Sequence, residues 1–332
     1  MSEFPPLGFV VYRPTKWDDV VRLGRFHGDW VFRGHGDATW RLETSIERTA
    51  NRYGVSMEDR KGLERKLVER FQRAAHLYFP PTILPQADDW LGWMSVIQHY
   101  GGPTRLLDFT ESFYCAAFFA LEATERPAVI WAVNRRHLEE RIARSLSVET
   151  KKRRDLDIRT ELRDQINEAI EYRKGLRPVV LPFFPNRLHE RLAQQQGLFL
   201  TAGRVDRFFE TQLLEVLGID PEELTNPKEI RSKVATKPDL DELQNLGVVK
   251  IEIGVKQHRK GRAELRRMNL TAQSMYPGSE GYARALHWEL GLLQAGEPDF
   301  RPMNEGSAKD LAKRLKVGRT KRPAAPKDRR GS

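Results

Sequence analysis

The sequence lacks most of the features that assign a protein to a compartment. It contains one cysteine, Cys115, which cannot form an internal disulfide, and a cytoplasmic setting fits that. No apolar run approaches the roughly 18 residues that a membrane helix needs. The first residues lack a basic segment followed by an apolar one. We therefore expect a cytoplasmic protein without a secretion signal or membrane span, and we interpret Cys115 as a small core residue.

The motifs of several common enzyme classes are missing as well. No Gly-x-Gly-x-x-Gly opens a helix and no Walker-type loop is present, so the common nucleotide-binding folds lack support. The eight histidines show neither the His-x-x-x-His nor the His-Glu-x-x-His spacing, so no metal site is predicted. Because no Gly-x-Ser-x-Gly elbow is present, a serine hydrolase lacks support too.

The net charge of +10 is unevenly distributed along the chain. Residues 309–332 contain ten Lys or Arg and two Asp or Glu, so the rest of the chain carries only +2. This segment has few apolar residues and contains prolines and glycines, which predicts a disordered tail. Its charge also allows an arm that binds nucleic acid or another polyanion, although no aromatic residues accompany the basic ones.

Apolar patterning predicts an α/β (α+β) fold in which helices pack around a mixed, split β-sheet. Strands are expected at 9–13, 30–33, 128–133, 178–182, 198–202 and 248–253, with a further short strand ending near 108–110. Helices are expected over 57–78, 88–100, 111–123, 206–217 and 258–268. The densely charged stretch at about 135–175 is interpreted as a helical insertion.

The first chemistry-bearing motif contains Arg33, at the end of an apolar, β-prone stretch. An arginine at a strand end faces a cleft with a rigid fork of donors, which suits a carboxylate or a pyrophosphate. The following Gly34 and Gly36 free the backbone to turn, and a glycine allows a ligand to approach the main chain closely. In the alternative interpretation, Arg33 is structural and pairs with Asp37 or Asp108.

The second motif is the stretch 99–110, His-Tyr-Gly-Gly-Pro-Thr-Arg-Leu-Leu-Asp-Phe-Thr. It predicts a helix that stops at the glycines, a short strand, and a second helix. Small residues on that second helix allow close packing against the sheet: Ala116, Ala117 and Ala120. Asp108 or Thr110 can cap the helix, and Asp108 with Glu111 has the spacing of a capping box. In the functional alternative, Asp108 and Thr110 lie at the mouth of the same cleft as Arg33.

The third motif is a run of glutamines, Gln194 to Gln196, that precedes Gly197 and an apolar strand. A side-chain amide is costly to bury without hydrogen-bond partners. It offers both a donor and an acceptor, which can hold a ribose hydroxyl or a base edge. The alternative is a helix end closed by Gly197, with glutamines in solvent.

Together these stretches resemble the FRG domain family, which is named for the Phe-Arg-Gly found here at 32–34. The resemblance continues at 98–110, in the alanine-rich stretch 116–120, in Arg191 with 195–199, and more loosely at 275–278. It implies the following organisation: a lead-in over 1–24, the FRG domain over 25–285 with the insertion at about 135–175, a C-terminal extension over 286–308, and the basic tail over 309–332.

The order of these motifs resembles the layout of ADP-ribosyltransferases. In that layout an arginine ends the first core strand, a Ser- or Thr-bearing strand leads into an alanine-rich helix, and Glu or Gln precedes a later strand. The resemblance implies NAD as the substrate and three catalytic residues: Arg33, Thr110 and Gln196. It also implies residues that bind the cofactor, with no metal: Gly34, His35, His99, Tyr100, Asp108 and Gln195.

In this scheme Arg33 binds the pyrophosphate, and the ribose loses nicotinamide through an oxocarbenium-like state. Enzymes with this layout usually use a glutamate to activate the acceptor, whereas a glutamine stands here; Glu190 and Glu210 are possible substitutes. Because a glutamine is a poor base, both ADP-ribosyl transfer and NAD hydrolysis stay open. The bacterial and phage-associated settings of the family imply a toxin or an antiviral defence protein.

Two other function classes stay open. One is a non-catalytic module that binds nucleic acid or a phage component through residues 309–332. The other is a metal-dependent nuclease whose acids are Asp108, Glu111 and Asp206. A nucleic-acid binder usually has a basic folded body, and the near-neutral body of this chain argues against the first.

Overall fold

The computed structural model describes residues 7–24, 30–145, 160, 163–164, 166–167, 179–185, 190–220, 228–231 and 246–294. The chain divides into two compact units, 1–282 and 283–332, and the elements below belong to the first unit unless stated otherwise. The predicted basic tail at 309–332 lies outside the described residues. So does most of the predicted insertion at 135–175, of which the first part is the helix α6 (Arg135–Ser145).

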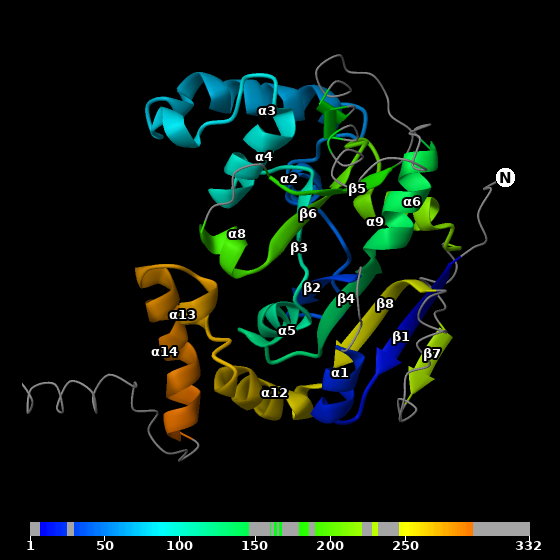
Figure 1. The fold of residues 1–332 in the computed structure, drawn as a ribbon, viewed down its shortest axis with the longest axis vertical. Coiled ribbons are helices and arrows are strands. Elements are labelled where there is room, and N and C mark those ends of the chain that lie inside the picture. The colour runs from blue at the N-terminus through cyan, green and yellow to red at the C-terminus, as the bar shows by residue number, and fades with distance from the viewer. Residues whose placement is uncertain are drawn as a thin grey trace, which may run out of the picture. The chain divides into compact units, whose positions relative to one another are not determined.

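The core is one mixed sheet of eight strands in the order β5-β6-β3-β2-β4-β8-β1-β7 (Figure 1). The strands are β1 (Gly8–Arg13), β2 (Trp30–His35), β3 (Leu106–Thr110), β4 (Ala128–Asn134), β5 (Val180–Phe183), β6 (Gly197–Ala202), β7 (Lys228–Arg231) and β8 (Leu246–Ile253). β1 runs parallel to β7 and β8, and the other neighbours are antiparallel. The predicted mixed α+β fold is confirmed.

Helices pack around this sheet in groups. One group consists of α1 (Trp17–Leu23), α5 (Phe113–Leu121) and α12 (Val255–Arg267), and it contacts β2, β4 and β8. A second group consists of α6 and α9 (Phe209–Leu217), which contact each other and β5. Figure 1 shows the two groups on different sides of the central strands. Because both sides are covered, β4 is buried along its whole length.

Six helices and one 3-10 turn complete the helical elements of the described part of the chain. They are α2 (Ser45–Arg52), α3 (Arg60–Ala75), the 3-10 turn η1 (Pro81–Ile83), α4 (Trp90–His99), α8 (Glu190–Gln194), α13 (Ala272–Met275) and α14 (Ser279–Gln294), which continues into the second unit. None of the helices in the described part of the chain has both the length and the apolar character needed to cross a bilayer.

The pairing between β2 and β3 is much shorter than the pairing of either strand with its other neighbour. Phe32 opposite Thr110 is the register pair of these two strands. By contrast, β2 pairs with β4 from Trp30 to His35, and β3 pairs with β6 from Leu106 to Thr110. The predicted split therefore takes the form of a continuous sheet whose two parts separate beyond one shared position.

Gly34 is required where β2 lies against α5. A Cβ atom at this position would stand 1.9 Å from the Ala116 carbonyl oxygen and 2.6 Å from the Ala120 nitrogen. Both alanines are fully buried, which confirms the predicted close packing of small residues against the sheet. From the sequence we expected that a glycine at position 34 would let a ligand approach the main chain. In the structure, a side chain is excluded here by the backbone of α5.

The start of α5 differs from the prediction. The helix begins at Phe113, and its N-cap is Ser112, whose hydroxyl accepts a hydrogen bond from Cys115 N at 3.3 Å. Thr110 is still part of β3 and only supports the turn, accepting from Ser112 N at 2.9 Å. The predicted capping by Asp108 or Thr110 was therefore wrong. Cys115 is a buried free thiol, and burial raises its pKa, in keeping with a core residue.

The side chain of Arg105, just before β3, links this strand to α3 and to the end of β6. Its Nε donates to Glu64 Oε1 on α3 at 2.9 Å, and its Nη1 donates to the Gly203 carbonyl at 3.0 Å. Both side chains are almost completely buried. Because a buried guanidinium is tolerated only when its charge and its donors are matched, this pair holds α3, β3 and the end of β6 together.

The packing at Gly34 makes the first prediction. We expect Gly34→Ala to lower the free energy of unfolding by about 3 kcal/mol, because the backbone of α5 cannot move away without opening the core. Urea denaturation followed by circular dichroism measures this change. The matched control is Gly62→Ala on α3, where an added Cβ meets nothing within 4 Å and should stabilise the helix by about 0.5–1 kcal/mol. Wild-type stability of Gly34→Ala would contradict the close packing.

Candidate functional site

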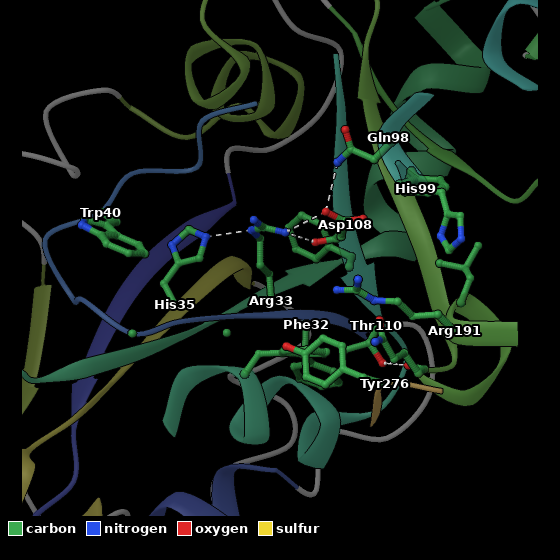
Figure 2. A pocket seen from close by; sticks show the side chains of 17 residues that line it. Phe32, Arg33, His35, Trp40, Gln98, His99, Asp108, Thr110, Arg191 and Tyr276 are labelled. Carbon is green, nitrogen blue, oxygen red and sulfur yellow. Dashed lines mark hydrogen bonds and ion pairs between the residues drawn. The ribbon is translucent and has the colours of Figure 1, made fainter. Parts of the chain in front are cut away.

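A cavity of about 350 Å³ opens where β2 and β3 separate (Figure 2). It is lined by side chains from segments far apart in the sequence: Arg33 and His35 of β2, Gln98 of α4, Asp108 of β3, Arg191 of α8, and Tyr276 just after α13. The three motifs found in the sequence thus meet at one place. Thr110, Gln195, His99 and Gly34 also line the cavity.

Arg33 lies at the centre of this cavity and bridges the two parts of the sheet. Its Nη1 donates to the Asp108 carbonyl oxygen at 2.6 Å and lies 3.6 Å from the Asp108 carboxylate. Its Nε donates to His35 Nε2 at 2.7 Å. The side chain of Arg33, on β2, therefore forms a hydrogen bond to the main chain of β3 beyond the register pair of these two strands. Burial lowers the pKa of Arg33, and the nearby Asp108 opposes that shift.

The structural alternative for Arg33 is thus realised in part. Asp108 is its partner, whereas Asp37 is bonded to Thr39 and Arg126. The side chain of Arg33 still keeps about a fifth of its surface exposed toward the cavity (18%). An arginine held by a neighbour on each side presents its remaining N–H groups in a fixed direction.

His35 fixes the orientation of Arg33. Because its Nε2 accepts a hydrogen bond from Arg33, the ring proton belongs on Nδ1 and the imidazole is neutral. Burial, followed by the charge of Arg33, lowers the pKa of His35 to about 3. A neutral acceptor at physiological pH lets the buried imidazole contact a guanidinium without like-charge repulsion.

Asp108 supplies the carboxylate of the cavity, and its side chain is about half exposed (55%). Gln98 Nε2 donates to Asp108 Oδ2 at 3.1 Å. The orientation of the Gln98 amide is itself determined, because its Oε1 accepts from Thr104 Oγ1 at 2.7 Å and from Ser45 Oγ at 3.1 Å. A chain of neutral hydrogen bonds therefore positions the one carboxylate among the described residues that line this cavity.

Thr110 and the glutamines occupy the opposite side of the junction. Thr110 Oγ1 donates to the Gln195 carbonyl at 2.6 Å, and Gln195 Nε2 donates to the Met275 carbonyl at 2.8 Å. Gln196 does not line the cavity; it is exposed, with a left-handed φ of 47°. The left-handed residue that follows α8 is therefore Gln196. From the sequence we expected Gly197 to end this helix, which was wrong by one residue.

An aromatic wall faces Arg33. The Arg191 guanidinium lies 4.7 Å from the centre of the Tyr276 ring, and the Tyr276 hydroxyl donates to Glu122 Oε2 at 2.6 Å. Phe119 packs edge-on against Tyr276. Burial lowers the pKa of His99, and the charge of Arg191 lowers it further, so this imidazole is neutral at physiological pH.

Some residues proposed from the sequence lie elsewhere. Tyr100 does not line the cavity; more than half of its surface is exposed, and its ring contacts Phe79 at 4.8 Å. Glu190 accepts a hydrogen bond from Gln194 on the outside of α8. Glu210 lines an adjoining cavity and binds Arg41.

The acids named for a nuclease are also separated. Glu111 pairs with Arg135 at 2.8 Å, and Asp206 pairs with Arg204 at 2.7 Å, so of the three acids only Asp108 lines the cavity. Within the described ranges, no group of three or more His, Cys, Asp or Glu side chains is arranged to hold a metal ion.

The set proposed from the sequence lacked several residues that line the cavity, among them Gln98, Arg191, Tyr276 and Trp40. The first three stand inside stretches that resemble the FRG family, so a signal for them was present. Trp40 follows the Phe-Arg-Gly motif by several residues in a loop, and nothing in its sequence context indicates that it lies beside His35.

The low pKa of His35 predicts how the free energy of unfolding changes at acidic pH. In the unfolded chain a histidine binds a proton near pH 6.5, whereas His35 in the fold does so only near pH 3. Between these values the unfolded state binds more protons, so stability falls as the pH falls. His35→Gln keeps an acceptor for Arg33 but does not titrate. Between about pH 7 and pH 4.5, we expect wild type to lose on the order of 2 kcal/mol more than this variant.

Urea denaturation at both pH values measures the difference. His76→Gln is the matched control, because His76 is an exposed histidine at the end of α3. It should lose as much stability on acidification as wild type. Equal losses for wild type and His35→Gln would show that His35 is not a neutral, buried acceptor.

Comparison with known proteins agrees with the position of these residues. The family model of the FRG domain matches residues 28–128, which include β2, α2, α3, α4, β3 and α5. No match was found among the curated proteins or among the solved structures. The matched interval supplies Arg33, His35, Gln98 and Asp108 to the cavity. The chain therefore contains an FRG domain at residues 28–128.

Proposed function

We propose that the cavity between β2 and β3 binds NAD and that the protein cleaves the bond between nicotinamide and ribose. One observation carries the proposal: an oriented guanidinium, Arg33, and a positioned carboxylate, Asp108, line the same cavity beside an aromatic wall. A dinucleotide presents the complementary groups, which are a pyrophosphate, a ribose and a flat nicotinamide ring.

Arg33 is suited to the pyrophosphate. Nε is used by His35 and Nη1 by the Asp108 carbonyl, which leaves N–H groups on the far side of the guanidinium for an anion. Both of these hydrogen-bond partners are neutral acceptors, so neither of them offsets the positive charge of Arg33. The Asp108 carboxylate lies 3.6 Å away and is the one competitor for that charge.

Asp108 is suited to the ribose. When the glycosidic bond breaks, its electron pair goes to the nicotinamide nitrogen, and positive charge develops on the ribose ring. A carboxylate facing that ring stabilises the charge. Water then adds at the same carbon and loses a proton, which Asp108 can accept. Gln98 keeps the carboxylate in place through the hydrogen bond to Oδ2.

The aromatic wall is suited to the nicotinamide. Phe119 is partly exposed and offers apolar surface next to neutral His99, which can exchange hydrogen bonds with the carboxamide. Gln195 uses its Nε2 on Met275, so its side-chain oxygen remains to accept from a ribose hydroxyl. The hydroxyl of Thr110 is engaged with main chain, which makes Thr110 a positioning residue for Gln195.

Hydrolysis is the main reaction in this proposal. Among the described residues that line the cavity, no carboxylate besides Asp108 is present to activate a second acceptor. The half-exposed Asp108 is also accessible to water. Because the loss of NAD stops growth, we place this activity in a toxin or antiviral defence setting.

The test follows nicotinamide release from NAD by the purified full chain. We expect Asp108→Asn, which preserves shape and removes charge, to lower kcat/KM by at least about 100-fold. Arg33→Lys should cause a loss of similar size, because an ammonium ion cannot reproduce the oriented fork. Glu111→Gln is the matched control, since it removes a neighbouring carboxylate that does not line the cavity, and it should retain wild-type activity.

Two outcomes would reject the proposal. One is the absence of nicotinamide release by wild type, in buffer and in lysate containing acceptors. The other is an equal loss of activity in Asp108→Asn and Glu111→Gln, which would show that the carboxylate in the cavity has no special role.

A further inference from the structure

A second cavity, of about 690 Å³, adjoins the first. Three residues line both of them: Arg33, His35 and Trp40. In Figure 2, His35 and Trp40 lie on the side of Arg33 that faces away from Asp108. Arg33 therefore stands at the boundary between the two cavities, and a ligand held by its guanidinium can extend into both.

The size of the first cavity indicates that it takes only part of a dinucleotide. Its volume of about 350 Å³ is close to the lower limit of the roughly 300–1,000 Å³ typical of small-molecule sites. NAD consists of two nucleotides joined through the pyrophosphate. If the nicotinamide riboside half fills the first cavity and the pyrophosphate is at Arg33, the adenosine half must continue beyond Arg33.

Arg48 of α2 supplies a second positive charge on this path. It lines the second cavity and is exposed, and its Nη1 is bonded to the main-chain oxygen of Glu43. Burial lowers the pKa of Arg33 and of His35, and the charge of Arg48 contributes to both shifts. Arg48 is thus near enough to repel Arg33, and an anion placed between two such arginines is stabilised by both.

The carboxylates of the second cavity do not neutralise Arg48. They are Glu43, Glu47 and Glu210. Each accepts hydrogen bonds inside the protein, Glu43 from Asn51, Glu47 from Phe209 N, and Glu210 from Arg41. Burial raises the pKa of Glu47, which favours its neutral form. In the described part of the chain, no carboxylate lies within ion-pair distance of Arg48.

Trp40 provides a flat apolar surface at the same place. The side chain is more than half exposed (57%), although tryptophan is usually well buried. Its ring meets the His35 ring edge-on, with centroids 6.0 Å apart, so the indole packs against a buried residue of β2. An exposed indole beside two arginines is the combination with which proteins stack a base next to its phosphate.

We propose that the second cavity binds the adenosine diphosphate part of the substrate, with the phosphates between Arg33 and Arg48 and the base stacked on Trp40. This inference rests on the proposed cleavage of NAD for its substrate, but the binding itself can be measured without catalysis. It makes Arg48 and Trp40 specificity-determining residues that distinguish a dinucleotide from a mononucleotide.

Calorimetric titration of the full chain with ADP tests the site directly. We expect ADP to bind wild type, and we expect Arg48→Ala and Trp40→Ala to weaken that binding at least about tenfold, since each removes one of the contacts. The matched control is Arg52→Ala, which removes the same charge from the same helix at an exposed position outside both cavities. It should bind ADP as wild type does.

A kinetic arm compares NAD with nicotinamide mononucleotide, which lacks the adenosine monophosphate half. Arg48→Ala should raise KM for NAD about tenfold while kcat is retained, and it should leave the mononucleotide kinetics unchanged. Thermal denaturation of each variant separates loss of binding from loss of fold.

The outcomes separate this inference from the proposed function. If wild type does not bind ADP, or if Arg48→Ala binds it as tightly as Arg52→Ala, the second site is overturned even when NAD is cleaved. If ADP binds and depends on Arg48 but no nicotinamide is released from NAD, the site stands and the proposed cleavage fails.

Discussion

The contact between Gly34 and the backbone of α5 is the constraint on which the site depends. Because no side chain stands at this position, α5 lies directly against β2, with Ala116 and Ala120 filling the space. The strand then leaves β3 after the single pair at Phe32 and Thr110. Arg33 occupies the resulting gap and donates to the carbonyl of Asp108, beyond the register pair of β2 and β3. The three residues of the Phe-Arg-Gly motif thus have separate roles. Phe32 pairs with β3, Arg33 bridges the gap between the strands, and Gly34 allows α5 to pack closely.

The charges around the gap follow from this geometry. Arg33 is oriented by two neutral acceptors, the Asp108 carbonyl and the His35 imidazole, while the Asp108 carboxylate offsets part of its charge. The low pKa of His35 is a consequence of burial and of Arg33 itself, and it keeps that arrangement intact across physiological pH. Gln98 places the Asp108 carboxylate through an amide whose orientation is determined by two hydroxyl donors. Such a site is organised before a ligand arrives, which lowers the cost of binding and of charge development.

Much of this could be predicted from the sequence, and the exceptions have physical reasons. Alternation along a strand places Arg33 and His35 on one face and Gly34 on the other, so their roles follow from the pattern. The sequence does not show which of Gln195 and Gln196 lines the cavity. The left-handed backbone at Gln196 breaks the regular pattern from which the direction of a side chain can be predicted. Tyr100 follows the last residue of α4, where helical spacing no longer applies, and its ring turns to Phe79. The helix α2 escaped prediction although Thr44 and Glu47 form a capping box, since few apolar residues mark its buried face.

A single arginine shared by two cavities links binding to chemistry in the proposed scheme. The guanidinium of Arg33 faces the Asp108 carboxylate at 3.6 Å, and part of the negative charge of Asp108 is offset. An incoming pyrophosphate carries more negative charge and competes for the same donors. The carboxylate would then be free to face the ribose, while the hydrogen bond from Gln98 keeps it from turning away. A mononucleotide that leaves the second cavity empty engages Arg33 with one phosphate where a dinucleotide engages it with two, so it displaces Asp108 less completely. On this argument, discrimination between substrates is exerted through Asp108 as well as through affinity.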